Sequence, residues 1–327
     1  MVLILSRLEL ESLLDMTDVI GVLEQAFNEQ AMGRALAPNR LSLSVRSNGG
    51  WLGIMPAYLE KLGALSTKIV TVFQDNPKKN LPTTMAMIVL NDPETGRILS
   101  VMDGGFITAM RTGGLGGLAA KLLSREDSQI AGIFGAGVQA RTQLLALKQV
   151  RDITLAKIYD PVLQRAEKFA EEMREKIQVP IELCKTPSDV VKDSDIIVTV
   201  STSKEPLFHG EILRPGMHLN AFGNFRANER ELDSETVRKS RVIVDNREAA
   251  LAEAGDLIIP IQESTITRDH IVADLGEIIA GRKEGRTSRK DITLFKSVGL
   301  GIQDSATAIL AYKKALKNRI GSEIELS

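Results

Sequence analysis

The chain of 327 residues is predicted to fold as an α/β protein in which an open, parallel β-sheet is inserted into a second, α+β domain. Two patterns predict this fold class. In residues 1–115, short extended segments follow one another with turn clusters between them, whereas from Gln129 onwards strands alternate with helices. A glycine-rich motif stands where the second pattern begins.

The first part begins with helical patterns and continues as a sheet. Ser6 and Glu9 have the spacing of a capping box, and residues 18–32 place apolar side chains on one helical stripe. Consecutive extended segments joined by short turns favour an antiparallel or mixed sheet. A long helix with small residues on its buried side, 106–124, follows. The extended segments are 41–45, 51–55, 65–73, 85–91 and 98–103.

The second part alternates strands and helices, which is the pattern of a parallel sheet covered on both faces. Helices are expected at 139–150 and 162–177. A last helix, 304–317, is expected to return to the first domain, so that one domain comprises residues 1–115 and 301–327 and the other residues 116–300. The expected strands are 130–134, 156–159, 181–184, 196–200, 218–222, 242–245 and 292–295.

Composition argues against several classes of protein. The formal net charge of −1 gives no general electrostatic reason to bind nucleic acid or an acidic membrane. The one cysteine, Cys184, excludes an internal disulfide and fits a reducing cytosol. The N-terminal apolar run is too short for a signal-peptide core, and we expect a soluble, cytoplasmic protein. No metal site is expected, because His209, His218 and His270 have no partner at metal-ligand spacing.

A glycine-rich motif carries the strongest functional signal. The expected strand 130–134 runs into a G-x-G-x-x-A sequence, and a helix follows it. Gly135 permits the tight turn, Gly137 lets a pyrophosphate approach the backbone, and the helix N-terminus offers free N–H groups to phosphates. We therefore expect a Rossmann-type, doubly wound parallel sheet that binds a dinucleotide. The motif reads Gly135-Ala136-Gly137-Val138-Gln139-Ala140.

An acidic residue stands at the end of the next expected strand. Asp160 lies about 20 residues beyond the motif, where a carboxylate would hydrogen-bond the ribose 2′-hydroxyl of the cofactor. It is followed by Pro161, and no basic residue directly after it could hold a 2′-phosphate. The sequence therefore favours NAD(H) as the cofactor and leaves NADP(H) open. A glycine-rich turn without a ligand is the alternative.

Small and polar residues end two later strands. Ser201 and Thr202 follow strand 196–200. Phe222 ends strand 218–222, and Gly223 and Asn224 follow it. Ligands of open α/β sheets bind at the carboxyl ends of the strands, so both loops are expected to border the cofactor. From position alone, polar loops without a ligand are an equally good interpretation.

Three cations stand out in the first domain. Lys68 lies in an otherwise apolar strand, where a lysine is costly unless it faces a cleft or an anion. Arg111 lies in the long helix just before a run of small residues, and Arg40 precedes the first extended segment. Three cations beside a nicotinamide would suit a substrate with a carboxylate. From periodicity alone, solvated or ion-paired strand ends would be the commoner interpretation.

Seven segments of the chain carry a resemblance to a known family. They are 50–58, 66–70, 101–104, 107–112, 135–140, 231–233 and 295–297. Together they resemble the ornithine cyclodeaminase/mu-crystallin family over nearly the whole chain. The resemblance implies a homodimer built through the first domain, which binds substrate, and a Rossmann domain that binds NAD(P). It implies that Arg40, Lys68 and Arg111 hold a substrate carboxylate, and it adds Thr112 and Lys296 as expected cofactor contacts.

Two departures from the family pattern help to choose a branch. The cyclodeaminases and archaeal alanine dehydrogenases of the family have an Asp, thought to handle the substrate amine, where this chain has Phe225. The alanine dehydrogenase branch has an Arg where this chain has Gly53. Phe225 points away from both branches, and Gly53 points away from the alanine dehydrogenase branch.

Other segments are more similar to the mu-crystallin branch, which reduces ketimines. They are 51–58, Arg226 and 248–251. Mu-crystallin prefers NADPH, however, and has Asn-Arg where this chain has Asp160-Pro161. In that respect the chain resembles the members that use NAD.

The resemblance therefore implies an NAD(P)H-dependent oxidoreductase that reduces a cyclic imino acid, such as Δ1-pyrroline-2-carboxylate or Δ1-piperideine-2-carboxylate, to the cyclic amino acid. Such a substrate can enter as an iminium and needs no strong protein acid, so Phe225 in place of Asp is tolerable. The alternatives are an alanine dehydrogenase or ornithine cyclodeaminase of the same family and, from another class, a non-catalytic protein that binds a dinucleotide or small ligand. Neither nucleic acid nor a membrane is an expected partner.

Overall fold

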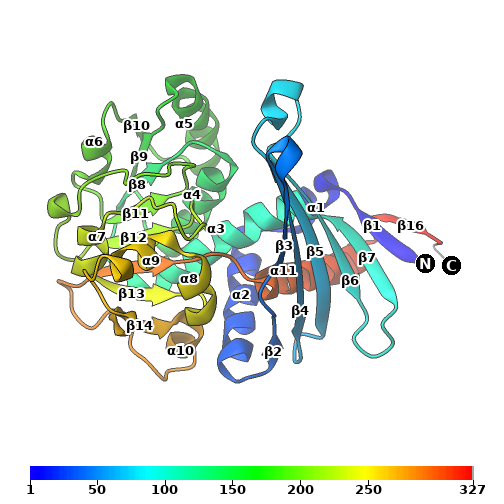
Figure 1. Ribbon diagram of the computed structural model, residues 1–327. Coiled ribbons are helices and arrows are strands. Elements are labelled where there is room, and N and C mark those ends of the chain that lie inside the picture. Colours follow the sequence, from blue (N-terminus) through cyan, green and yellow to red (C-terminus); the bar gives the residue numbers. More distant parts are fainter. Residues whose placement is uncertain (326–327) are drawn as a thin grey trace. The chain divides into compact units, whose positions relative to one another are not determined.

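The computed structural model describes residues 1–325, apart from the side chain of Pro77. The chain divides into two compact units, Met1–Arg111 with Leu300–Ser327 and Thr112–Gly299, which we call unit 1 and unit 2. The first division falls within helix α3 (Gly104–Leu123), so the expected boundary after residue 115 lies further along the same helix. Each unit contains one eight-stranded sheet (Figure 1).

The sheet of unit 1 is mixed, as the short turns between its strands predicted. Its order is β16-β1-β7-β6-β5-β4-β2, with β3 also paired to β4. Among the described strands of this sheet, only β1 and β7 pair in parallel, and the other pairs are antiparallel. The strands are β1 (Val2–Leu5), β2 (Ala35–Leu36), β3 (Leu41–Val45), β4 (Gly50–Leu59), β5 (Ala64–Phe73), β6 (Thr84–Asn91), β7 (Ile98–Asp103) and β16 (Ser322–Ile324).

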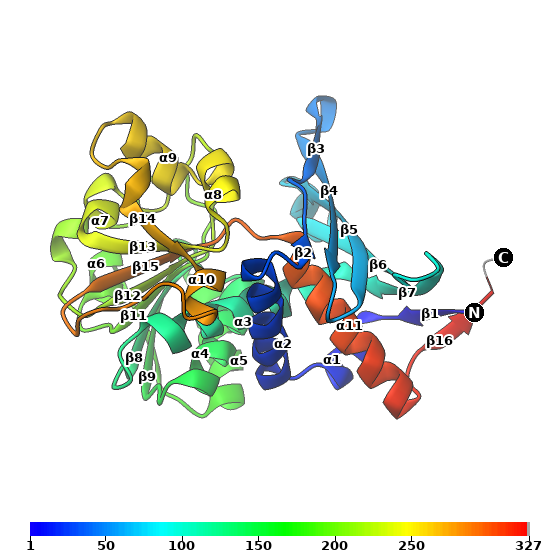
Figure 2. The same ribbon diagram turned by 90° about the horizontal axis from the view of Figure 1, so that it is seen from below.

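Helices cover one face of this sheet. The expected capping box is present, since Ser6 caps α1 (Arg7–Leu13) together with Glu9. Helix α2 (Met16–Ala31) begins after Asp15, whose carboxylate accepts from Asp18 N. Helix α11 (Gly301–Asn318) packs on β4, β5 and α2 (Figure 2). The hydroxyl groups of Ser66 on β5 and Ser305 on α11 are 2.7 Å apart, which joins helix and sheet in the core.

The other face of this sheet carries apolar side chains that remain exposed in the described part of unit 1. Leu41 on β3 is 65% exposed and Met87 on β6 is 42% exposed. The register aligns them with half-buried apolar residues on the strands between, and residues paired directly across antiparallel strands point to the same face. One row is Leu41, Ile54, Ile69 and Met87; the next is Leu43, Leu52, Thr71 and Met85.

The sheet of unit 2 is entirely parallel among its described pairs, with the order β10-β9-β8-β11-β12-β15-β13-β14. The order reverses between β8 and β11, which is the arrangement of a doubly wound sheet and confirms the expected Rossmann-type fold. The strands are β8 (Ile130–Phe134), β9 (Leu155–Tyr159), β10 (Ile181–Leu183), β11 (Ile196–Thr199), β12 (His218–Ala221), β13 (Ser240–Val244), β14 (Ile271–Asp274) and β15 (Ile292–Lys296).

Helices lie on both faces of this sheet (Figure 2). On one face, Leu144 of α4 and Phe169 of α5 pack against Ile133 and Ile158 of the central strands, and these four side chains are fully buried. The helices are α4 (Val138–Val150), α5 (Leu163–Ile177), α6 (Pro187–Val191), α7 (Ser234–Lys239), α8 (Arg247–Glu253), α9 (Gly255–Gln262) and α10 (Leu275–Ile279). Within residues 1–325, no helix combines the length and the apolar character needed to cross a membrane.

The small residues of α3 let α4 approach closely. A Cβ atom on Gly113 would lie 2.5 Å from the backbone carbonyl of Thr142, and one on Gly116 would overlap the side chain of Gln143. The Gln143 amide instead donates a hydrogen bond of 3.0 Å to the carbonyl oxygen of Thr112. Helix packing therefore accounts for glycine at these two positions of the small-residue run that follows Arg111.

Candidate active site

The glycine loop of unit 2 has the conformation that a pyrophosphate site requires. Gly135 has a φ of +94°, and a Cβ atom there would lie 2.8 Å from the carbonyl oxygen of Val200. Gly137 is the N-cap of α4, without a side-chain cap, and a Cβ atom on it would have no described heavy atom within 4 Å. The first turn of α4 therefore has no side-chain cap, and its free N–H groups fit an anion such as a pyrophosphate.

Asp160 is held beside this loop. Its Oδ2 accepts from the N–H of Ala136 at 2.9 Å, and its Oδ1 accepts from the N–H of Val162 at 2.9 Å. From the other side, Arg141 donates to the carbonyl oxygens of Ala136 and Gly137. The carboxylate is thus fixed at the end of β9, next to the open N-terminus of α4, where a ribose hydroxyl could share it.

Two buried polar atoms near the strand ends lack a hydrogen-bond partner among the described residues. They are the side-chain oxygen of Gln139, in the first turn of α4, and the hydroxyl of Thr199, at the end of β11. Buried polar groups are nearly always paired, so an orphan at a strand end is a place for a ligand. The Gln139 amide can also present its NH₂ group if its orientation is reversed. The glycine loop, Asp160 and these orphans together fit a dinucleotide.

Glu231 joins the loops that follow β11 and β12. Its Oε1 accepts from the N–H and the hydroxyl of Ser201 at 2.9 and 2.6 Å, and its Oε2 accepts from the N–H of Gly223 at 3.0 Å. Burial and the nearby carboxylate of Asp256 raise the pKa of Glu231 to about 7, against the opposing effects of Ser201 and Lys296. One carboxyl group therefore sets the distance between two loops that were expected to border the cofactor.

A buried ion pair supports the same loops. Lys296, at the end of β15, donates to the carbonyl oxygen of Asn224 at 2.5 Å and pairs with Asp256 at 2.6 Å. The other oxygen of Asp256 accepts from the N–H groups of Glu231 and Leu232. Sequence reasoning gave Glu231 no role and did not single out Asp256. The sequence did contain one signal for Glu231, because segment 231–233 is among those that carry the family resemblance.

The remaining expected cofactor residues of unit 2 differ in burial. Thr112 is buried, Phe222 is half-buried against Phe295 with ring centroids 5.7 Å apart, and the others are exposed. The exposed ones are Val138, Pro161 and Thr202. Phe225, which stands where relatives have Asp, is half-buried in the loop after β12.

In unit 1, the structure brings Lys68 and Arg111 together on an aspartate that sequence reasoning missed. Nζ of Lys68 lies 2.6 Å from Oδ2 of Asp304, and Nε of Arg111 lies 3.0 Å from Oδ1. Nη1 of Arg111 donates to the side-chain oxygen of Gln303 at 2.6 Å. Lys68 is 2% exposed and Asp304 is fully buried. The three groups come from β5, α3 and α11.

The charges in this cluster favour an additional anion. The pKa of Lys68 is lowered to about 8, because burial, Arg111 and Arg40 lower it by more than Asp304 raises it. Arg40 is therefore close enough to act on Lys68, and the two buried cations Lys68 and Arg111 share one carboxylate. A buried excess of positive charge is costly unless an anion compensates it. We call Arg40, Lys68, Arg111 and Asp304 the cation cluster.

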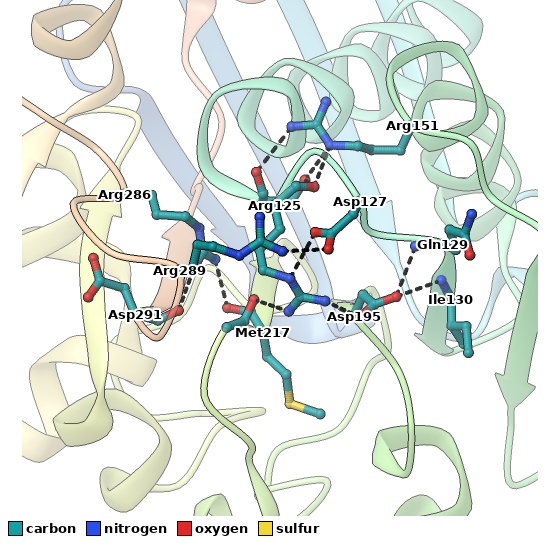
Figure 3. A network of polar contacts seen from close by, with 12 residues as sticks. Arg125, Asp127, Gln129, Ile130, Arg151, Asp195, Met217, Arg286, Arg289 and Asp291 are labelled. Carbon is teal, nitrogen blue, oxygen red and sulfur yellow. Dashed lines mark hydrogen bonds and ion pairs between the residues drawn. The ribbon is translucent and has the colours of Figure 1, made fainter.

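A second polar cluster lies at the amino-terminal edge of the unit 2 sheet (Figure 3). Arg125 pairs with Asp195 at 2.6 Å, and Asp195 also accepts from the N–H groups of Gln129 and Ile130. Arg151 donates to the carbonyl oxygens of residues 120, 121, 124 and 125, which closes the end of α3. The adjoining cavity of about 340 Å³ is lined by Arg125, Asp127, Ser194, Asp195, Arg214, Pro215, Met217 and Arg289. Arg125 and Arg289 pair with the lining acids Asp127 and Asp195, and Arg214 pairs with Asp193, which indicates a structural role.

The buried histidine has a structural environment as well. His218 lies between the hydroxyl of Thr293 and the side-chain oxygen of Asn220, each at 3.0 Å. Burial and the nearby Arg286 lower its pKa to about 3, so the ring is neutral. Within the described part of the chain, no three His, Cys, Asp or Glu side chains gather in an arrangement that could hold a metal ion.

The sequence model of the ornithine cyclodeaminase/mu-crystallin family matches residues 1–319. The chain belongs to this family. It is similar to the Δ1-pyrroline-2-carboxylate reductase of Thermococcus litoralis, solved in complex with NADH and L-proline. The identity is 48% and the TM-score 0.97, over 98% of this chain and 100% of that one.

Two further members of the family illustrate its range. An archaeal alanine dehydrogenase, solved as a dimer with bound NAD, has 37% identity and a TM-score of 0.94, over 100% of this chain and 99% of that one. A Δ1-pyrroline-2-carboxylate reductase of Bacillus cereus is 38% identical over 324 residues, which are 99% of each chain. The resemblance read from the sequence motifs is confirmed, and members of the ornithine cyclodeaminase/mu-crystallin family that resemble the whole chain include reductases and dehydrogenases.

Proposed function

We propose that the protein is an NAD(H)-dependent oxidoreductase that reduces a cyclic imino acid, with Δ1-pyrroline-2-carboxylate as the favoured substrate. The observation that carries this proposal is the cation cluster, in which buried Lys68 and Arg111 share one aspartate and retain an excess of positive charge. A planar imino acid with one carboxylate supplies the missing negative charge. The identity of 48% with the Thermococcus litoralis reductase supports the same substrate class.

In this proposal the cation cluster holds the substrate carboxylate. Arg111 uses Nε and Nη1 for Asp304 and Gln303, which leaves Nη2 and the second hydrogen of Nη1 for a carboxylate. Lys68 and Arg40 add charge. Holding the carboxylate fixes the position of the imine carbon next to it, so the protein contributes mainly orientation and electrostatic stabilisation.

The cofactor is proposed to bind unit 2 along the glycine loop, with Asp160 on the adenosine ribose. NADH, when bound, supplies a hydride to the imine carbon. The nitrogen also needs a proton, and a substrate that enters as the iminium already carries it. The reaction then needs no acidic proton donor at the position of half-buried Phe225. The carboxylate of Asp160 disfavours a 2′-phosphate, so we propose NAD(H) over NADP(H).

Alanine dehydrogenase is the second candidate, because a relative of that activity covers the whole chain at 37% identity. Its reaction must hold free ammonia, and Phe225 offers no charge or hydrogen bond for it. We test the two candidates by NADH oxidation with Δ1-pyrroline-2-carboxylate, with Δ1-piperideine-2-carboxylate, and with pyruvate plus ammonium. Faster turnover with a cyclic imine supports the reductase. Turnover with pyruvate and ammonium alone would assign the protein to the dehydrogenases.

We further propose that the protein is a homodimer formed through the apolar face of the unit 1 sheet. Leu41, Ile54, Ile69 and Met87 lie in one row across four strands, and contiguous exposed apolar rows mark protein interfaces. Met87→Glu is expected to give a monomer in light scattering. Leu8→Glu, at an apolar position on α1 that is 78% exposed, is the matched control and should leave the dimer intact.

A cytosolic location is proposed as well. The single thiol of Cys184 is buried, and burial raises its pKa to about 11, so it remains an unreactive thiol in a reducing compartment. Fractionation of the native cells, with the protein detected by antibody, tests this location. Recovery with the membrane pellet would contradict it.

A further inference from the structure

We propose that Asp304 is a positioning residue of the reductase, which orients Arg111 and keeps Lys68 protonated so that both can bind the carboxylate of the imino acid. This inference rests on the proposed function. Asp304 is fully buried in the first turn of α11, and each of its two oxygens contacts a cation from another element. No local sequence pattern or family motif indicated a role for it.

The orientation of Arg111 follows from two neighbouring residues of α11. Asp304 accepts from Nε at 3.0 Å and Gln303 accepts from Nη1 at 2.6 Å, which fixes the plane of the guanidinium group. Of the five N–H groups of an arginine, three remain, both of those on Nη2 and one on Nη1, at the end of the fork. A carboxylate can accept two parallel hydrogen bonds from this end. Without Asp304, the guanidinium could rotate about its last bonds and lose this alignment.

The charge of Lys68 depends on the same carboxylate. The charged groups that face Lys68 are Arg111 from α3, Arg40 from the segment before β3, and Asp304 from α11. Its cross-strand partners, Met55 on β4 and Ile88 on β6, carry no charge. Burial and two cations therefore disfavour the ammonium form, and the carboxylate of Asp304 favours it. Removing this charge lowers the pKa of Lys68 below its present value of about 8, so the lysine would be largely neutral near neutral pH.

A purely structural role would give different observations. An acidic residue in the first turn of a helix also stabilises the helix through its dipole, so loss of stability in a variant would not by itself support positioning. The protonation state of Lys68 distinguishes the two roles, because a carboxylate ligand that binds a neutral lysine must bring a proton with it. The number of protons taken up on binding is therefore the decisive quantity.

The experiment is calorimetry of pyrrole-2-carboxylate binding to the NADH-loaded protein, in buffers of different ionisation enthalpy, at about pH 7. This probe keeps the planar ring and the carboxylate but has no basic nitrogen. The wild type should take up only about 0.1 proton, because a group with a pKa of about 8 is mostly charged at this pH. Asp304→Asn should take up close to one proton and bind at least about tenfold more weakly, with unchanged affinity for NADH.

Steady-state kinetics give a second readout. The alkaline limb of kcat/KM for the cyclic imine should move to lower pH in Asp304→Asn, with most of the loss in KM. Asp15→Asn is the matched control, because Asp15 pairs with Lys314 on the exposed side of α11 and asparagine remains a good N-cap for α2. It should change neither the proton uptake nor the pH profile.

If Asp304→Asn does not fold, Asp304→Glu tests the inference, because it keeps the negative charge but moves the carboxylate away from its native position. It should leave the proton uptake at the wild-type value and weaken binding; wild-type affinity would overturn the inference. A folded Asp304→Asn with unchanged proton uptake and an unchanged pH profile would overturn it too. Failure of the wild type to bind the probe or reduce the imine, with NADH still bound, would overturn the proposed function and this inference with it.

Discussion

The ammonium nitrogen of Lys296 lies 2.6 Å from Oδ2 of Asp256, and neither side chain is exposed to solvent. The pair joins the end of β15 to α9, and hydrogen bonds extend it to Asn224 and to the backbone of Glu231 and Leu232. A direct contact of Lys296 with the cofactor stays a prediction. The contacts present in the structure give Lys296 a role in holding the loop after β12.

Removing one partner of this pair should destabilise the protein strongly. Lys296→Met leaves the carboxylate of Asp256 buried without its cation, and such losses cost about 3–5 kcal/mol of unfolding free energy. Urea unfolding followed by circular dichroism measures the change. Lys314→Met, which removes the cation that the half-exposed carboxylates of Asp15 and Asp18 share, is the control and should cost at most about 1 kcal/mol. Equal effects of the two substitutions would contradict the importance given to the buried pair.

Glu231→Gln should weaken NADH binding. The carboxylate accepts three hydrogen bonds from Ser201 and Gly223, whereas the amide nitrogen of glutamine cannot accept any. An unsatisfied buried donor costs about 1–3 kcal/mol, and we expect NADH affinity to fall by about tenfold as the two loops adjust. Fluorescence titration with NADH checks this. Glu235→Gln, on the nearby helix α7, should bind NADH as the wild type does.

The raised pKa of Glu231 predicts a pH dependence of stability. Its pKa is about 7 in the folded protein against 4.5 for a glutamate free in water, so the folded state holds the proton more tightly than the unfolded state. The stabilising contribution is complete below the unfolded value and is lost as the pH rises through about 7. Between about pH 5 and 8 the unfolding free energy of the wild type should fall relative to Glu231→Gln, by at most about 3 kcal/mol. A constant difference across this range would show that Glu231 does not titrate there.

Asp160 is predicted to select NAD(H). Asp160→Ser with Pro161→Arg removes the carboxylate that would repel a 2′-phosphate and adds a cation that could bind it. The ratio of kcat/KM for NADPH to that for NADH should rise by at least about 10²-fold. Pro161→Ala alone, at an exposed position, should leave the ratio nearly unchanged. A wild type that already prefers NADPH would refute the assignment of Asp160.

The sequence predicted the elements whose ends carry strong local signals. Strands β3, β7 and β8 have the expected bounds, because apolar or alternating residues end there at turn clusters or at the glycine motif. Helix α3 begins earlier than expected because Asp103 accepts from the N–H of Phe106, and neither residue belongs to a familiar capping box. Strands β1 and β16 were not expected; they pair with each other from the two ends of the chain, and no local pattern reveals such a pairing.

The site was predicted unevenly for a similar reason. Lys68 and Arg111 were identified because a cation in an apolar strand or helix is conspicuous. Their shared partner Asp304 was not, since it lies 193 positions after Arg111 and an acid in the first turn of a helix is common on protein surfaces. Only the tertiary fold shows that it is buried, and the same holds for Asp256.

The most direct test is the rate of NADH oxidation with Δ1-pyrroline-2-carboxylate, measured for the wild type and for Lys68→Met together with the NADH affinity of each. The wild type should form proline. Lys68→Met should lower kcat/KM by about 10²–10³-fold, since it removes a buried charge from the carboxylate site, and should keep the NADH affinity of the wild type. Full activity of Lys68→Met, or a wild type that oxidises NADH only with pyruvate and ammonium, would contradict imino-acid reduction at the cation cluster.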